Sequence, residues 1–178
     1  MMMYSLDTQS YELYKKGVDV MTNWVRSNGT MMTVCPTGNS NYELPLQNLA
    51  GIWGFSEYYL YTADTETIAT AYNMAKTYVD LYSIGSNGLV NHRAGQWDWP
   101  DWGSHADTAP QENAWYYLAL QSCKTMAQVL GKTEDIASYD TRMKSIELNY
   151  DRVFWNGSAY YNSTDNGIPD DRANAMAV

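Results

Sequence analysis

Residues 109–130 read APQENAWYYLALQSCKTMAQVL, a stretch whose apolar side chains point to nearly every face of a helix. A helix that is apolar all round is buried all round, so this segment is expected to lie inside the protein. Pro110 stands in its first turn, where the backbone amide that proline lacks has no helical partner anyway. The stretch therefore predicts a buried helix that opens with a proline.

A second stretch has the same design. Residues 44–61 include LAGIW at positions 49–53 and are again apolar on nearly every face. Pro45 stands in the first turn, and Asn48 follows it at the same distance at which Asn113 follows Pro110. The two stretches thus agree beyond composition, and a third copy is expected to begin at Pro169.

One-faced helices alternate with these buried ones. They are expected to start at Asp7-Thr8, Asp64-Thr65 and Thr133-Glu134, where capping side chains can accept from the free amides of a first turn. Each is expected to end near an Asn-Gly pair, at residues 28–29, 87–88 and 156–157. The apolar positions recur at steps of three and four and form one stripe on each helix: Tyr11, Tyr14, Val18, Met21 and Val25; Ile68, Tyr72, Ala75, Val79 and Tyr82; and Ile136, Tyr139, Met143, Ile146 and Tyr150.

The alternation of one-faced and fully buried helices describes two concentric layers, as in an α/α toroid or an α-solenoid. The order is outer, inner, outer, inner, outer and the start of another inner helix, about half of a closed ring. We therefore expect an all-α fold with one partial toroid domain over residues 1–178. The open sides of such a half ring would expose apolar surface, so self-association or binding of a complementary fragment is also expected.

The segments that lead from outer to inner helices are long, and the one at residues 88–108 contains QWDWPDWG at positions 96–103. Exposed tryptophan surface is unfavourable in water, so three tryptophans in one loop, Trp97, Trp99 and Trp102, indicate a role in binding or packing. In the functional interpretation they form a platform for sugar rings, and Asp98 and Asp101 accept hydrogen bonds from sugar hydroxyls. In the structural interpretation the loop folds back and fills the toroid with its own aromatic side chains.

The starts of the buried helices supply the other candidate substrate-binding residues. Glu43, Glu112 and Asp171 lie at these starts, and Asn48, Asn113 and Asn174 lie within the first two turns. If the buried helices are parallel in a ring, their amino ends point at one basin below the tryptophan loop, and the three asparagines face it as amides that bind hydroxyl groups. The alternative is that the carboxylates only stabilise the positive ends of the helix dipoles.

Composition and motifs exclude several other functions. The net charge is −9, which repels phosphate-rich partners, so neither nucleic acid nor an anionic membrane is expected as a partner. No apolar run is long enough to span a membrane, and residues 1–6 do not resemble the start of a signal peptide. Cys35 in a loop and Cys123 in a helix are expected to be free thiols.

No metal centre and no cofactor are expected. The chain has two histidines, His92 and His105, and their surroundings lack the spacing of a zinc site. We interpret His105 and Asp107 as a pair that orders the loop. The sequence contains neither a phosphate-binding loop nor a nucleophile-elbow motif.

Six stretches, in order along nearly the whole chain, resemble the six-hairpin catalytic domain of bacterial α-L-rhamnosidases. They are ELPLQNLA (43–50), YYLYTAD (58–64), WDWPDWG (97–103), ENAWYYLAL (112–120), LGKTED (130–135) and DDRANA (170–175). The resemblance implies an (α/α)₆ toroid and an inverting glycoside hydrolase that releases terminal rhamnose from glycans. The part of the site that it carries over is the tryptophan loop, with Asp101-Trp102-Gly103 as its best match.

The resemblance also implies where the catalytic carboxyls of the family stand. The general acid is a glutamate in a Cys-Pro-x-Arg-x-Glu-like segment ahead of the first helix, and the general base is a glutamate in a later hairpin. Cys35-Pro36-Thr37-Gly38 lacks the arginine and the glutamate and is not that segment. We therefore expect a chain that holds part of a sugar pocket but lacks the general acid and the general base, so that its catalytic residues are unknown and it hydrolyses aryl rhamnosides little or not at all by itself.

Two other functions stay open at this point. Related six-hairpin enzymes act on glucosides, unsaturated uronides and trehalose, so the sugar could be a different one. A non-catalytic helical-repeat interaction module would explain the paired helices equally well. It gives no reason, however, for a loop rich in Trp and Asp above the buried helix starts.

Overall fold

The structure is a computed structural model that describes residues 11–36, 42–95, 97–102, 106–161 and 168–177. Helices form the regular secondary structure of this part of the chain, and three isolated β-bridges occur in the segments between them. The helices are α2 (Glu12–Asn23), α3 (Pro45–Thr62), α4 (Thr65–Val79), α5 (Thr108–Val129), α6 (Thr133–Phe154) and α7 (Asp171–Met176). The all-α prediction is confirmed.

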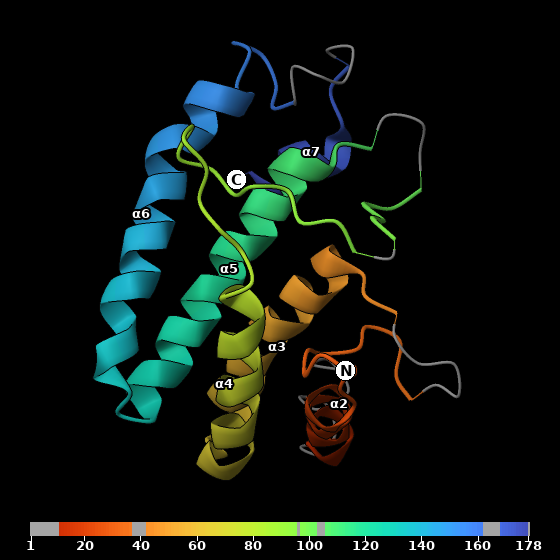
Figure 1. Cartoon of the computed structure of the whole chain (residues 1–178), viewed down its shortest axis with the longest axis vertical. Coiled ribbons are helices and arrows are strands. Elements are labelled where there is room, and N and C mark those ends of the chain that lie inside the picture. Colours follow the sequence, from red (N-terminus) through yellow and green to blue (C-terminus); the bar gives the residue numbers. More distant parts are fainter. Residues whose placement is uncertain (1–10, 37–41, 96, 103–105, 162–167, 178) are drawn as a thin grey trace.

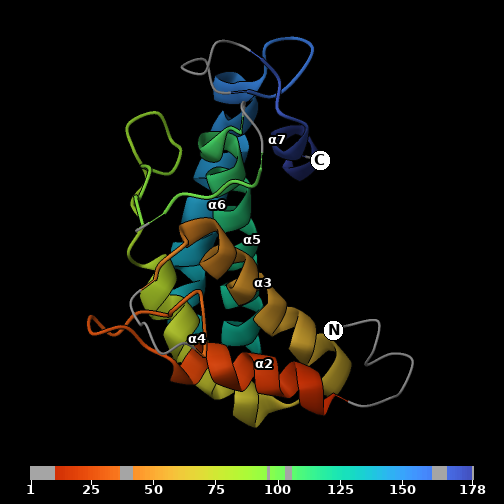
Figure 2. The ribbon, with the colours of Figure 1, turned by 90° about the vertical axis from the view of Figure 1, so that its right-hand side faces the viewer.

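The helices form an inner and an outer layer (Figures 1 and 2). In the inner layer α5 packs between α3 and α7, and in the outer layer α4 packs against α2, while α6 packs on α5. The predicted buried helices at residues 44–61 and 109–130 correspond to α3 and α5. The predicted alternation of outer and inner helices is therefore confirmed as well.

The outer helices bury the predicted stripe unequally. Ile68, Tyr72, Ala75 and Val79 of α4 are all buried, and α6 buries its stripe from Tyr139 onward. On α2, by contrast, Val18 is buried whereas Tyr14 and Met21 are only half-buried. The latter two line an apolar hollow of about 520 Å³ between α2 and α3. The stripe on α2 is thus less completely covered by the described residues than those on α4 and α6.

The Asn-Gly pairs do not end the helices directly. α2 ends at Asn23 and α4 at Val79, and in all three repeats the Asn-Gly pair lies in a turn closed by a β-bridge. The glycines of these turns have φ of 81°, 82° and 100°, a left-handed conformation in which a side chain is strained. The three bridges are Val25 to Met31, Ile84 to Val90 and Trp155 to Tyr160. The sequence repeat is therefore a repeat of helix, bridged turn and loop.

Side chains cap the starts of α4 and α7. Asp64 accepts a hydrogen bond from the backbone N–H of Thr67, as predicted for the start of α4. The expected helix start at Asp7-Thr8 lies outside the described residues. At the third inner helix the capping residue is Asp170, one position after Pro169.

Cys35 and Cys123 are both free, as predicted, and Cys123 is buried in α5. Among the described helices, none combines the length and hydropathy that crossing a membrane requires.

Candidate functional site

The first turns of the three inner helices meet around one cavity of about 450 Å³. α3 contributes Gln47, α5 contributes Gln111 and α7 contributes Arg172. The complete lining is Leu46, Gln47, Ala50, Trp99, Pro100, Asp101, Gln111, Trp115, Arg172, Ala175 and Met176. The predicted basin at the amino ends of the buried helices is therefore present, and we call it the basin below.

A buried carboxylate joins the starts of α5 and α7. The same oxygen of Asp170 accepts from the backbone N–H of Asp107, at 3.1 Å, and from Nε2 of Gln111, at 3.0 Å. Its other oxygen accepts from Nε of Arg172, at 2.6 Å. Burial opposes ionisation of Asp170, but these donors outweigh it and hold the pKa of the carboxyl below its usual range. The floor of the basin is thus fixed by hydrogen bonds.

The aromatic loop, residues 97–102, forms one wall of the basin and contacts two of the inner helices through its backbone. Nε2 of Gln47 donates to the carbonyl of Trp99 at 2.9 Å. The guanidinium of Arg172 donates to the carbonyl of Trp102. Just ahead of the loop, Gly95 packs so closely on the start of α3 that a Cβ there would lie 2.5 Å from the carbonyl oxygen of Glu43. The aromatic loop is therefore held against the starts of α3 and α7.

The three tryptophans of the aromatic loop form one cluster. Trp97 and Trp99 are stacked, with ring centroids 5.5 Å apart, and Trp102 meets Trp99 edge to face at 5.8 Å. Trp99 lines the basin, while Trp97 and Trp102 are 51% and 78% exposed. Trp115 of α5 also lines the basin. Such exposure of large aromatic surface beside a cavity is typical of a binding site.

Asp101 adopts a positive φ of 97°, which is uncommon for a residue with a side chain. Its carboxylate accepts a hydrogen bond from the backbone N–H of Trp102 at 2.8 Å, and the residue lines the basin. Backbone strain of this kind is concentrated at functional sites. The turn therefore presents an exposed carboxylate next to Trp99.

Gln47 has a buried acceptor that faces no donor among the described residues. While its Nε2 donates to Trp99, its Oε1 has no hydrogen-bond partner. A buried carbonyl oxygen without a donor costs about 1–3 kcal/mol. A bound hydroxyl group would supply the missing donor.

Glu43 lies outside the lining of the basin, in an ionic cluster. Its carboxylate pairs with Arg26 and Arg93 and accepts from the hydroxyl of Tyr78 at 2.9 Å. Burial opposes its ionisation, but the hydrogen bonds and charges of its partners prevail and lower its pKa. Glu43 thus joins the loop before α3 to α4 and to the loop after it, and a direct contact with sugar stays a prediction.

Asn48 and Asn113 occupy equivalent positions in the repeat. Asn48 accepts from the hydroxyl of Thr33 at 2.9 Å and donates to the carbonyl of Met31 at 3.3 Å. Asn113 accepts from the backbone N–H of Val90 at 2.9 Å and donates to the carbonyl of Ala109 at 3.0 Å.

The third copy has the same arrangement, since Asn174 exchanges two hydrogen bonds of 2.8 Å with the backbone of Tyr160. Met31, Val90 and Tyr160 are the second partners of the three β-bridges. Each inner helix therefore uses an amide to hold the bridged turn that precedes it, and a role of Asn48 and Asn113 in sugar binding stays a prediction.

Replacing Asn113 with alanine is expected to destabilise the domain by about 1–3 kcal/mol, because the buried N–H of Val90 loses its acceptor. Urea denaturation followed by circular dichroism measures the change. Asn91→Ala is the matched control, because Asn91 is exposed and its amide donates to the hydroxyl of Ser83. Equal stability losses for both variants would contradict the structural role of Asn113.

Glu112 and Asp98 both contact His92. Glu112 is buried in α5 and lies 2.9 Å from Nδ1, whereas Asp98 is half-buried in the aromatic loop and lies 3.0 Å from Nε2. Burial raises the pKa of Glu112. Neither carboxylate lines the basin, so their predicted contact with sugar stays a prediction.

Asp171 does not line the basin, and two further residues of the predicted site region are not described by the structure. The side chain of Asp171 is 96% exposed and stays outside the lining of the basin. Gly103 and His105, with the proposed pairing of His105 and Asp107, lie outside the described residues. Within the part of the chain that the structure describes, no group of three His, Cys, Asp or Glu side chains is placed to hold a metal ion.

Sequence reasoning missed four residues that line the basin: Gln47, Gln111, Trp115 and Arg172. Three of them stand in the first turn of an inner helix, but at different distances from Pro45, Pro110 and Pro169, so the repeat spacing that relates Asn48 to Asn113 does not identify them. The position of Arg172 between Asp170 and Trp102 depends on tertiary contacts that the sequence does not show.

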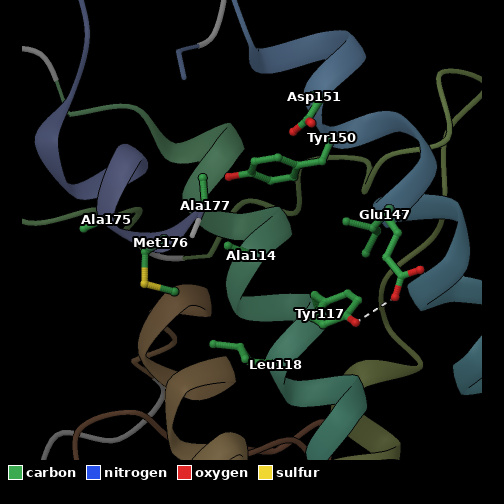
Figure 3. Close-up of a pocket in the computed structure, with 10 residues that line it drawn as sticks. Ala114, Tyr117, Leu118, Glu147, Tyr150, Asp151, Ala175, Met176 and Ala177 are labelled. Carbon is green, nitrogen blue, oxygen red and sulfur yellow. Dashed lines mark hydrogen bonds between the residues drawn. The ribbon is translucent and has the colours of Figure 1, made fainter. Parts of the chain in front are cut away.

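A second groove of about 380 Å³ lies between α5, α6 and α7 (Figure 3) and adjoins the basin at Ala175 and Met176, which line both. Its lining includes Tyr117, Tyr150 and Met176, and the hydroxyl of Tyr117 donates to Glu147 at 2.8 Å across it. Neither the tryptophan cluster nor an unpartnered buried acceptor faces this groove. The basin is therefore the better candidate site.

Comparison with known proteins agrees with this architecture. A search of curated proteins gave no match to the chain. Among solved structures, the GH78 family rhamnosidase of Bacillus sp. GL1 is similar with a TM-score of 0.71 and 21% identity. The match covers 86% of this chain and 17% of that one, so the chain spans about a sixth of the rhamnosidase, and the likeness is one of fold. The model of the bacterial alpha-L-rhamnosidase 6 hairpin glycosidase domain matches residues 1–177, and the chain belongs to this family.

Proposed function

We propose that this domain contributes one wall and the floor of the sugar pocket of an α-L-rhamnosidase-type glycoside hydrolase that acts on terminal sugars of glycans. The observation that carries the proposal is the basin, where exposed tryptophans stand beside the first turns of three inner helices. Membership of a rhamnosidase family supports a carbohydrate as the ligand.

The chemistry of the lining suits a neutral sugar. The faces of Trp99 and Trp115 offer apolar surface for the C–H side of a pyranose ring. Around them, Asp101 and the unpartnered Oε1 of Gln47 can accept from hydroxyl groups, and Arg172 can donate. A few polar groups placed around an apolar lining are typical of small-molecule sites.

The proposal assigns sugar binding to this chain and leaves proton transfer to other residues. Glycoside hydrolysis needs two carboxyl groups free to act as acid and as base or nucleophile. Three buried carboxylates near the basin have basic partners instead: Glu43 has Arg26 and Arg93, Glu112 has His92, and Asp170 has Arg172. Such pairing favours structural roles for these three carboxylates.

Titration of the chain with L-rhamnose, followed by tryptophan fluorescence, tests the proposal. We expect a saturable change that Trp155→Phe leaves intact, because Trp155 lies beyond the end of α6 and outside the basin. Gln47→Leu is expected to weaken binding, since it removes the unpartnered acceptor. The absence of a response to L-rhamnose and to other monosaccharides, together with tight binding of a protein partner, would favour an interaction module instead.

A further inference from the structure

The imidazole of His92 lies between two carboxylates from different parts of the fold. Nδ1 is 2.9 Å from Oε2 of Glu112 in α5, and Nε2 is 3.0 Å from Oδ2 of Asp98 in the aromatic loop. The other oxygen of Glu112 accepts from the backbone N–H of Arg93 at 3.3 Å. Through this arrangement an imidazole connects the aromatic loop to α5.

The number of N–H groups on the imidazole of His92 determines whether both of its contacts are hydrogen bonds. An ionised carboxylate only accepts, and a neutral imidazole has a single N–H, so one of the two contacts would then join two acceptors. The imidazolium has two N–H groups and satisfies both. We propose that His92 is a proton-dependent latch, which holds the aromatic loop on α5 while it donates to both Glu112 and Asp98 and releases Asp98 when the extra proton leaves.

The different burial of Glu112 and Asp98 determines which of the two hydrogen bonds is lost when His92 is deprotonated. The side chain of Glu112 is 2% exposed, so its Oε2 would lose the imidazole donor without gaining water. The side chain of Asp98 is 30% exposed and can be solvated when the imidazole no longer donates to it. Deprotonation therefore breaks the contact with Asp98 rather than that with Glu112, and the backbone contacts of the aromatic loop with Gln47 and Arg172 remain.

The charged groups around His92 stabilise its protonated form, the imidazolium. Glu112 faces it from α5 and Asp98 from the aromatic loop. The guanidinium of the neighbouring Arg93 is turned to Glu43 and lies next to Tyr78 of α4 and Tyr82 just after α4. Burial lowers the pKa of His92, but the two carboxylates outweigh it, so the pKa is raised above its usual value. Both hydrogen bonds of His92 are consequently present below the ordinary pKa of histidine. The bond to Asp98 is lost as pH rises through the raised pKa of His92.

The latch concerns the position of Trp97 and Trp99, which flank Asp98, and only its effect on sugar binding rests on the proposed function. A looser aromatic loop would weaken the stacking surface at the basin without changing its floor. The latch itself can be measured without any sugar.

The test is an NMR titration of the ¹⁵N-labelled chain between about pH 5 and 8, where histidine titrates. The chain has two histidines, so His105→Gln assigns the signals of His92. We expect the indole N–H signals of Trp97 and Trp99 to shift with the same midpoint as His92. In Asp98→Asn and in Glu112→Gln, an amide can donate to the neutral imidazole, so the shift of the indole signals should be lost although the loop stays attached.

His92→Phe provides the opposite control, since it removes both contacts and should leave the indoles in the high-pH state throughout. The latch is overturned if the indole signals keep their pH dependence in Asp98→Asn, or if His92 titrates while the indoles do not respond. If L-rhamnose binds at no pH but the indoles still follow His92, the latch stands and the proposed function fails.

Discussion

Replacing Glu43 with alanine is expected to destabilise the domain by about 3–5 kcal/mol, the usual cost of removing one partner from a buried ion pair. Glu43 is 3% exposed and pairs with Arg26 and Arg93, whose side chains are 10% and 21% exposed. Without the carboxylate, two guanidinium groups would be left close together with no counter-charge from Glu43. Urea denaturation followed by circular dichroism measures the loss.

Two variants make the test of Glu43 specific. Glu43→Gln keeps the shape and some hydrogen bonds but removes the charge, so an intermediate loss is expected. Asp140→Ala breaks the more exposed pair with Lys124 and should change stability by no more than about 1 kcal/mol. A loss for Glu43→Ala as small as that for Asp140→Ala would contradict the ionic cluster.

The ionic cluster also has a pH dependence of known sign. Because the pKa of Glu43 is lowered in the folded chain, its contribution is present above the ordinary pKa of glutamate and is lost as pH falls through the lowered value. Glu43→Gln should therefore lose less stability on acidification than the unaltered chain does.

Replacing Trp99 with alanine is expected to weaken binding of L-rhamnose at least about tenfold, as is usual for a central tryptophan of a binding site. Trp99 lines the basin, stacks on Trp97 and meets Trp102 edge to face, so its removal also takes away the support of both. Its backbone carbonyl would still accept from Gln47, which should limit damage to the fold. An NMR titration with L-rhamnose gives the affinity.

Trp155→Ala is the matched control for Trp99→Ala. Trp155 is 45% exposed and packs on Tyr160, so it also contributes aromatic surface, yet it lies outside the basin. Equal affinities for the Trp99 and Trp155 variants would remove Trp99 from the site.

The inner layer could be predicted from sequence because its signals are local. Apolar residues on every face require burial, and prolines near the starts fix where α3 and α5 begin. The sequence predicts the ends of α2 and α4 too late, because an Asn-Gly pair is typical of a helix end. Their left-handed glycines belong to bridged turns, which continue the chain past the helix before it reverses.

The candidate site could be predicted only in part. The tryptophans stood out because their exposure is unfavourable without a purpose, and they do lie beside the inner helix starts. The partners of Glu43, Glu112 and Asn113 could not be read from sequence, since most of them come from loops that fold back over the helices. Their pairing depends on tertiary structure, as does the position of Arg172 between Asp170 and Trp102.

The most direct test of the sugar pocket is the set of NMR signals that L-rhamnose shifts in the unaltered chain. The account predicts saturable shifts of the indole N–H groups of Trp99 and Trp115 and of the side-chain amides of Gln47 and Gln111, all of which line the basin. Saturable shifts confined to the groove between α5, α6 and α7, or no shifts at any concentration of the sugar, would contradict it.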